Sequence, residues 1–264
     1  MATLALSTVT RQETLSSLLA RQRAAFLRHG PPSLVERRAN LKKLRAALLA
    51  RKADFEAALD ADFGHRSRHE TGIMETLLVT WGIDYLHKNL RRFMQRERRH
   101  VALPMRRARA YVESQPLGIV GIVAPWNYPF SLALMPLATA LAAGNRAMMK
   151  PSELTPATSN LLVSLIAETF SEDEVAVITG DASVGAAFSA LPFDHLFFTG
   201  STAVGRAVMR AGTGDAGAWR QVPRAGRSRA AARARRDRHR LRQVGERGSD
   251  VRRARLHAAA RVRS

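Results

Sequence analysis

The fold is decided by an unbroken apolar run, Gly118-Ile119-Val120-Gly121-Ile122-Val123-Ala124, which leads into Pro125-Trp126-Asn127. The run has the length of a β-strand and no polar alternation, which is typical of a parallel strand buried on both faces. Further short strands are predicted at residues 145–150, 175–179 and 195–199, with helices at 132–143 and 159–170. This alternation predicts an α/β fold with a doubly wound parallel sheet.

The first 110 residues are predicted to be helical, because apolar residues recur at three- and four-residue spacing, as in Leu41, Leu44 and Leu48. Gly30-Pro31-Pro32 separates two of these helices, and Ser33 is the expected cap of the second. A charge-dense helix end, a break and a short extended segment are predicted next, at residues 92–99, 103–104 and 110–114.

Polar loops follow all four predicted strands, at residues 125–127, 150–153, 180–181 and 200–205. Ligands of doubly wound sheets bind beyond the carboxyl ends of the strands, and these ends share one edge of the sheet. The sequence therefore predicts that the four loops form one binding site.

The last loop, Gly200-Ser201-Thr202-Ala203-Val204-Gly205, follows an apolar strand and opens a helix. Its backbone N–H groups and the positive helix end would face a phosphate. It is not the G-x-G-x-x-G fingerprint, and a tight strand-to-helix turn is the alternative interpretation. Its position among four polar loops favours binding.

Lys150 and Glu153 flank Pro151-Ser152, so an ammonium and a carboxylate would point at one polyol such as a ribose. The alternative is a pair of exposed charges at a helix start that Ser152 caps. Asn127, beside Trp126, would donate a hydrogen bond to an oxyanion in a pocket of low dielectric. An asparagine that satisfies turn backbone is the other possibility there.

Segments 118–127, 150–156 and 197–205, in this order and spacing, resemble the cofactor-binding half of the aldehyde dehydrogenase family. Residues 62–67, D-F-G-H-R-S, with Glu70-Thr71, are similar to the coniferyl aldehyde dehydrogenase branch of that family. The resemblance covers about residues 10–211. It implies a helical part of the cofactor domain at 1–110 and a Rossmann-like NAD(P)-binding core at 111–211, and a change in composition sets off a tail at 212–264.

The resemblance also implies roles for single residues. Asn127 would help to hold an oxyanion, and Trp126 would line the nicotinamide side. Lys150 and Glu153 would bind the adenosine ribose, with Ser152 in the same cofactor-binding segment, and residues 200–205 would meet the pyrophosphate. The implied cofactor is NAD or NADP, and Glu153 favours NAD⁺ with its free ribose hydroxyl. The implied substrate is an aromatic or other bulky aldehyde, and intact members of the family are expected to be homo-oligomers.

In the implied reaction a cysteine thiolate attacks the aldehyde, hydride passes to NAD(P)⁺, and water activated by a glutamate hydrolyses the thioester. The chain contains no cysteine, and the family segments E-L-G-G-K and G-Q-T-C, expected after Gly205, are absent. We therefore expect an inactive, truncated form. Without cysteine there are also no disulfides or thiolate ligands, and no metal site is expected.

Between Arg210 and Asp215 the composition changes abruptly. Residues 212–264 contain sixteen Arg, no Lys and only four acidic residues, and they supply +12 of the formal net charge of +20. This Arg-rich tail is expected to be disordered or poorly folded. The N-terminus lacks a basic region followed by a long apolar stretch, and no apolar run is long enough to span a bilayer, so a cytoplasmic protein without membrane contact is expected.

The Arg-rich tail fits a shifted translation of the expected gene. Each codon's second and third bases, read with the first base of the next codon, permit I-A-S-G-K-L-V-N-A-G-Q-T-C-V-A-P-D-Y over residues 239–256. Residues 215–223 permit T-L-E-L-G-G-K-S-P in the same frame. The alternative is an arm that binds nucleic acid non-specifically through phosphates. Against it, the tail has Trp219 as its single aromatic residue and uses Arg without Lys.

Overall fold

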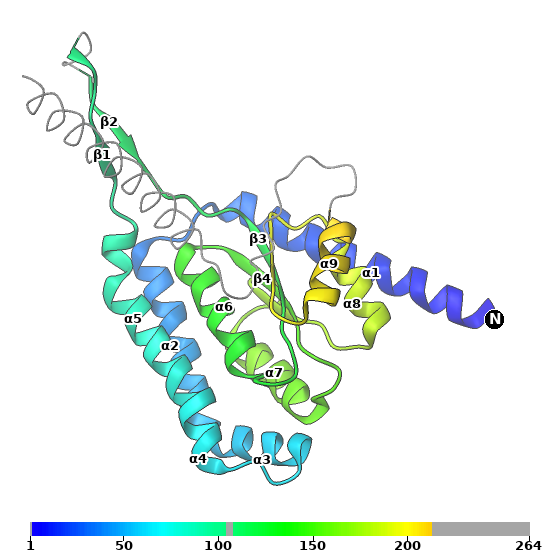
Figure 1. Cartoon of the computed structure of the whole chain (residues 1–264). Helices are drawn as coiled ribbons and strands as arrows, with labels where there is room; N and C mark the ends of the chain where they lie inside the picture. The colour runs from blue at the N-terminus through cyan, green and yellow to red at the C-terminus, as the bar shows by residue number, and fades with distance from the viewer. Residues whose placement is uncertain (1, 104–107, 213–264) are drawn as a thin grey trace, which may run out of the picture. The chain divides into compact units, whose positions relative to one another are not determined.

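A four-stranded parallel sheet lies between two layers of helices in the computed structural model of the chain, which describes residues 2–103 and 108–212 (Figure 1). The strand order is β5-β4-β3-β6. The strands are β3 (Ile119–Val123), β4 (Arg146–Lys150), β5 (Val175–Val177) and β6 (His195–Phe198). The predicted α/β fold with a parallel sheet is confirmed, and each strand is one or two residues shorter than predicted.

Both faces of the sheet are covered because side chains alternate along each strand. Val120 and Ile122 of β3 belong to one apolar cluster, while Ile119 belongs to a second cluster on the opposite face. In β4, Met149 joins the first cluster and Met148 joins the second. The unbroken apolar run at 118–124 therefore reflects burial on both sides.

Eight longer helices form the two layers among the described residues. The cluster around Val120 includes buried residues from α2 (Leu34–Ala50), α3 (Lys52–Phe63), α5 (Leu78–Phe93), α6 (Ser131–Ala143) and α7 (Pro156–Thr169). The cluster around Ile119 includes residues from α1 (Ala2–His29), α8 (Ala182–Ser189) and α9 (Thr202–Gly212). A short α4 (Arg68–Thr71) and a π-helical turn, η1 (Gly72–Leu77), lead into α5.

Local signals explain several helix ends. Ser33 caps α2 as predicted, and it forms a capping box in which Glu36 Oε2 accepts from the Ser33 amide at 2.7 Å. Gly144 ends α6 with a φ of 85°, a left-handed conformation that glycine adopts readily. The side chain of Arg37 donates to the carbonyl of Ala143 at 2.8 Å, so α2 also satisfies the end of α6.

The predicted charged helix end at residues 92–99 is wrong. Helix α5 ends at Phe93, and residues Glu97–Arg99 form β1, which pairs antiparallel with β2 (Ala110–Val112). Arg96 stabilises the pair from one side, because its Nε atom lies 2.9 Å from Glu113 Oε2 and its guanidinium lies 4.6 Å from the Tyr111 ring centre. Both strands are exposed along their whole length, and β1, in which every residue is charged, has no apolar alternation that would distinguish it from a helix end.

The predicted extended segment at residues 110–114 is confirmed by β2. The described residues belong to one compact unit. The predicted boundary between residues 110 and 111 stays a prediction, and the predicted Arg-rich tail lies outside the described residues, apart from Gly212 at the end of α9. None of the helices in the described ranges combines the length and hydropathy needed to cross a membrane.

Candidate functional site

The carboxyl ends of the four strands lie at one edge of the sheet. Val123, the last residue of β3, pairs with Lys150 on one side and with Phe198 on the other. The chain moves outward from β3 to β4 and β5, and then returns to place β6 on the free side of β3. The loops after β3 and β6 therefore flank the point where strand order reverses, which is where doubly wound sheets bind ligands.

Lys150 and Glu153 form a close ion pair at this edge. The Nζ atom of Lys150 lies 2.5 Å from Glu153 Oε2, and the Lys150 side chain is only 4% exposed, against 42% for Glu153. Burial acts to raise the pKa of Glu153, but hydrogen bonds from Lys150 and from the backbone, together with the Lys150 charge, outweigh it and lower that pKa. The carboxylate is therefore charged and reaches solvent, while the ammonium is buried behind it.

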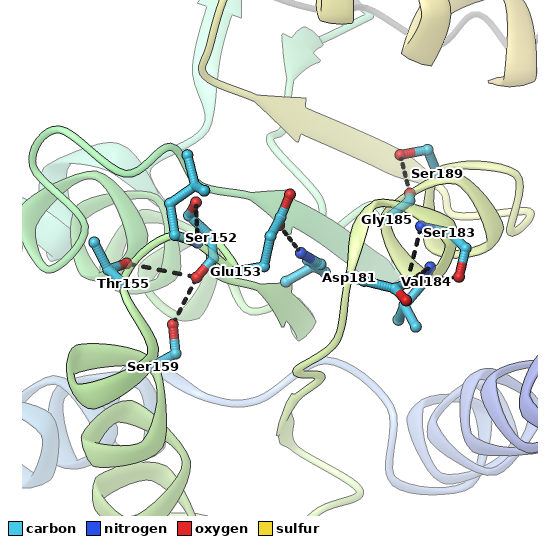
Figure 2. Close-up of polar contacts among 11 residues, drawn as sticks. Ser152, Glu153, Thr155, Ser159, Asp181, Ser183, Val184, Gly185 and Ser189 are labelled. Atoms are coloured by element: carbon cyan, nitrogen blue, oxygen red, sulfur yellow. Dashed lines mark hydrogen bonds and ion pairs between the residues drawn. The ribbon is translucent and has the colours of Figure 1, made fainter. Parts of the chain in front are cut away.

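Ser152 shapes the loop between these two residues. Its Oγ atom accepts from the Leu154 amide at 3.2 Å, and its carbonyl accepts from Ser159 Oγ at 2.9 Å (Figure 2). Helix α7 begins later, at Pro156, so Ser152 is not the cap of that helix. The alternative interpretation of this segment as a capped helix start is wrong in that respect, because two residue positions separate Ser152 from Thr155, the N-cap.

Asp62, a residue of α3, satisfies the start of α7 instead. Its carboxylate accepts from the amides of Ala157 at 3.0 Å and Thr158 at 2.8 Å, and from Thr158 Oγ1 at 2.7 Å. In the loop after β5, Asp181 caps α8 by accepting from the amides of Ser183 and Val184 (Figure 2). Both carboxylates stabilise a helix N-terminus at the edge that carries the predicted site.

The loop after β6 wraps around an aromatic ring. A Cβ atom at Gly200 would lie 2.6 Å from Cζ of Phe198, and one at Gly205 would lie 3.2 Å from Cε1 of the same ring. Ser201 Oγ accepts from the Val204 amide at 3.4 Å, and Ser201, Thr202, Ala203 and Val204 are exposed. Both glycines thus let the backbone approach Phe198, while the first turn of α9 faces solvent.

Trp126 and Asn127 follow β3 and are both exposed. The Trp126 ring lies 6.4 Å from the Phe63 ring centre. The backbone carbonyl of Asn127 accepts from Arg66 Nη1 at 3.2 Å. The structure places Asn127 at the strand-order reversal, and its proposed role toward an oxyanion stays a prediction.

Sequence reasoning missed Arg66 and Glu75, two buried charged residues beside this loop. Glu75 is fully buried, and its Oε2 atom accepts from the Ser131 amide at 2.6 Å. Burial raises the pKa of Glu75 above its ordinary value, against the hydrogen bond from Ser131 and the charge of Arg66. The available signal was a single acidic residue in an otherwise uncharged stretch, G-I-M-E-T-L-L, which begins at Gly72.

No cluster of three potential metal ligands occurs in the part of the chain that the structure describes.

The aldehyde dehydrogenase family model matches residues 3–224 of the chain. A probable coniferyl aldehyde dehydrogenase of Pseudomonas aeruginosa is 50% identical over 197 residues, which cover 75% of this chain and 41% of that protein. A coniferyl aldehyde dehydrogenase of a Pseudomonas species is 47% identical over 199 residues, with the same two shares. The chain thus spans about two fifths of the length of these curated relatives.

Solved structures show the same fold. A substrate-bound AldH of Staphylococcus aureus superimposes with a TM-score of 0.72 and 34% identity, over 74% of this chain and 42% of that one. An aldehyde dehydrogenase from Burkholderia cenocepacia, described as putative in its own structure report, gives a TM-score of 0.69 and 26% identity over 80% of this chain and 42% of its own. By family match, sequence identity and fold alike, the chain belongs to the aldehyde dehydrogenase family.

Proposed function

We propose that residues 2–212 form the NAD(P)-binding half of an enzyme that oxidises aldehydes to carboxylic acids. The observation that carries the proposal is the convergence of the loops after β3, β4 and β6 at the point where strand order reverses. Family membership supplies the reaction class, and the geometry supports the assignment of the edge to the cofactor.

The side chains at this edge suit a dinucleotide. The charged, partly exposed carboxylate of Glu153 is an acceptor for ribose hydroxyls, and the buried Lys150 ammonium holds it in place. The first N–H groups of a helix such as α9 have no backbone partner within the helix, so they suit a pyrophosphate. Trp126 and Asn127 would lie on the nicotinamide side. When bound, the cofactor would supply the hydride acceptor.

The chain as written would bind the cofactor without turning over substrate. It contains no cysteine, so the thiol that opens the family's reaction is missing. Loss of a nucleophile costs about six orders of magnitude in turnover in proteases whose catalytic groups act as a unit. A clear NAD⁺-linked turnover of any aldehyde by the purified chain would contradict this part of the proposal.

We further propose an aromatic aldehyde as the substrate class of the intact enzyme, because two of its most similar relatives are named for coniferyl aldehyde. The test uses a gene in which the reading frame after residue 210 has been restored. Its product should oxidise coniferyl aldehyde with a higher kcat/KM than a short aliphatic aldehyde such as propanal. The opposite preference would contradict the substrate class and leave the cofactor site untouched.

A shifted frame explains the Arg-rich tail best, because two expected family segments can be translated from it in one consistent register. The test is to sequence both strands of the DNA from the codon of Val204 to several hundred bases beyond residue 264. One small insertion or deletion that restores E-L-G-G-K and G-Q-T-C in one open frame is the expected result. A confirmed frame with nothing similar downstream would make the tail a genuine part of a non-catalytic protein.

Cofactor binding is tested by isothermal titration of the purified chain with NAD⁺ and NADP⁺. Saturable binding of NAD⁺ that persists after residues 213–264 are removed is expected. Any binding of nucleic acid should be non-specific, should weaken steeply with salt, and should vanish with the same deletion. Absence of NAD⁺ binding by a folded chain would contradict the proposed cofactor site.

A further inference from the structure

Two buried side chains from another part of the chain, Arg66 and Glu75, hydrogen-bond to the backbone of the loop between β3 and α6. Arg66 Nη1 donates to the carbonyl of Asn127 at 3.2 Å, and Glu75 Oε2 accepts from the amide of Ser131 at 2.6 Å. We infer that Arg66 and Glu75 are positioning residues that act as one clamp. The clamp fixes the backbone of residues 127–131, and thereby the directions in which Trp126 and Asn127 present their side chains.

The two members of the clamp are also paired with each other. Arg66 Nη1 lies 3.5 Å from Glu75 Oε1, and the two side chains are 6% and 0% exposed. Charges held at this depth interact strongly, and removal of Arg66 leaves Glu75 buried without its cation, whereas Arg66 has a second carboxylate partner, with Nη2 at 3.5 Å from Glu70 Oε1. The pair therefore couples the Asn127 carbonyl to the Ser131 amide, four residues further along the chain.

Aromatic packing extends the clamp to both neighbours of Asn127. The Arg66 guanidinium lies 4.8 Å from the ring centre of Phe63 and 4.8 Å from that of Tyr128. Phe63 in turn contacts the ring of Trp126. A planar guanidinium between two rings is held more rigidly than a lysine ammonium would be, because it stacks as well as donates.

The backbone around the clamp is unusual at two points. Gly64 and His65 both have positive φ values, 61° and 75°, immediately before Arg66. A histidine in this conformation costs energy that the surrounding contacts must offset. Glu75 lies in the π-helical turn η1, and such turns occur frequently at functional sites. The fold thus tolerates conformational strain to bring both charges to the loop.

The role of the clamp rests on the proposed function. In that function Asn127 would help to hold the oxyanion, and Trp126 would line the nicotinamide side of the site. Neither Arg66 nor Glu75 is assigned contact with substrate or cofactor. Their role is to hold the loop in the conformation that the cofactor and substrate would meet.

The test reads the loop directly, through the ¹⁹F resonance of Trp126 in the full chain labelled with 5-fluorotryptophan. Trp81, Trp126 and Trp219 give three resonances, which single Trp→Phe changes assign. Arg66→Met should shift or split the Trp126 resonance and leave that of Trp81 in place. Arg66→Lys, which keeps the charge, should also move it, because a lysine cannot stack and donate in the same geometry. Glu75→Met should move it, and Glu75→Gln, which keeps an acceptor for Ser131, should move it less.

Arg51 provides the matched control. It also contacts several partners, with Nη1 at 3.1 Å from Ser164 Oγ and 3.0 Å from Glu168 Oε1, but these lie on α7 and not on the loop. Arg51→Met should leave the Trp126 resonance unchanged. Hydrogen exchange gives a second readout: Arg66→Met should accelerate exchange in residues 124–131 about tenfold, corresponding to the loss of one buried contact, while the middle of α6 stays protected.

An unchanged Trp126 resonance in Arg66→Met and Arg66→Lys, in chains that remain folded, would overturn the inference. So would equal acceleration of exchange throughout the fold, because that is the signature of a general loss of stability. NAD⁺ titration of the same samples separates the two proposals. A chain that does not bind NAD⁺, but whose Trp126 resonance responds to Arg66, contradicts the cofactor site and leaves the clamp standing.

Discussion

Phe198 lies directly beneath Gly200, so close that a Cβ atom at residue 200 would be 2.6 Å from the ring's Cζ atom. We predict that Gly200→Ala lowers the free energy of unfolding by about 1–3 kcal/mol, since the buried ring must move to admit a methyl group. Gly205→Ala, where the nearest ring atom would be at 3.2 Å, should cost less. Urea denaturation of the natural chain and of the two variants measures the free energies of unfolding. Equal losses at Gly200 and Gly205 would contradict the explanation from the distances to Phe198.

Gly72→Ala, at a glycine far from Phe198 in the sequence, is the control for the two glycine variants. Gly72 has an ordinary helical φ of −59°, and a Cβ atom there meets nothing within 4 Å. The change should therefore be neutral or stabilise the fold by up to about 1 kcal/mol, because alanine loses less backbone entropy than glycine. A loss of stability similar to that of Gly200→Ala would show that the cost at Gly200 does not come from Phe198.

Glu153→Gln is predicted to reduce NAD⁺ affinity about tenfold, because an amide oxygen is a weaker acceptor for ribose hydroxyls than a carboxylate. The same change removes a negative charge that would repel the extra phosphate of NADP⁺, so the preference for NAD⁺ over NADP⁺ should shrink. Titration with both cofactors measures the ratio. Glu168→Gln, at an exposed side chain of α7, is the charge-matched control and should alter neither affinity.

Asp62→Ala is predicted to lower the free energy of unfolding by about 1–2 kcal/mol, since three donors at the start of α7 lose one shared acceptor. Asp60→Ala removes the same charge from an exposed position on the same helix and should change stability by less than about 0.5 kcal/mol. Thermal or urea unfolding compares the two. Equal losses would assign the effect to net charge and not to the cap.

Glu75 gives a prediction for pH. Burial raises its pKa in the folded chain above the value in the unfolded chain. A raised carboxyl pKa contributes stability that is fully present below the unfolded value and is lost as pH rises through the folded value. The stability of the natural chain relative to Glu75→Gln should therefore fall as pH rises from below the ordinary glutamate value toward neutrality. Urea unfolding at a series of pH values measures this difference, and a difference that grows with pH would contradict the assignment.

The sequence predicts the sheet well because a strand that is buried on both faces must be an unbroken run of apolar residues. Val120, Ile122 and their neighbours must all be apolar, and the loops that follow such strands must be polar or contain glycine. Lys150 and Gly200 are predictable at one edge of the sheet for the same reason, because each stands where an apolar strand gives way to a polar loop. The α2 cap at Ser33 is equally predictable, because a capping box is a local pattern of four residues.

Other features depend on contacts between residues far apart in the sequence, which no local pattern reveals. Arg66 and Asn127 are 61 positions apart, and Asp62 and Ala157 are 95 apart. Strand β1, and with it the β1–β2 pairing, escapes prediction for a different reason. All three residues of β1 are charged and exposed, and a run such as Glu97-Arg98-Arg99 favours a helix end as readily as a strand.

Strand β6 completes the sheet by returning to β3, so that Val120 finally pairs with His195. On a ribosome this pairing must wait until the whole segment between them has been made, yet it precedes the change in composition after Arg210. Synthesis of the roughly 50 residues that follow α9 takes about 3–10 s, long enough for the sheet to close while the chain is still attached. Whatever the frame of those last codons, the nascent chain would already contain all four strands of the described parallel sheet.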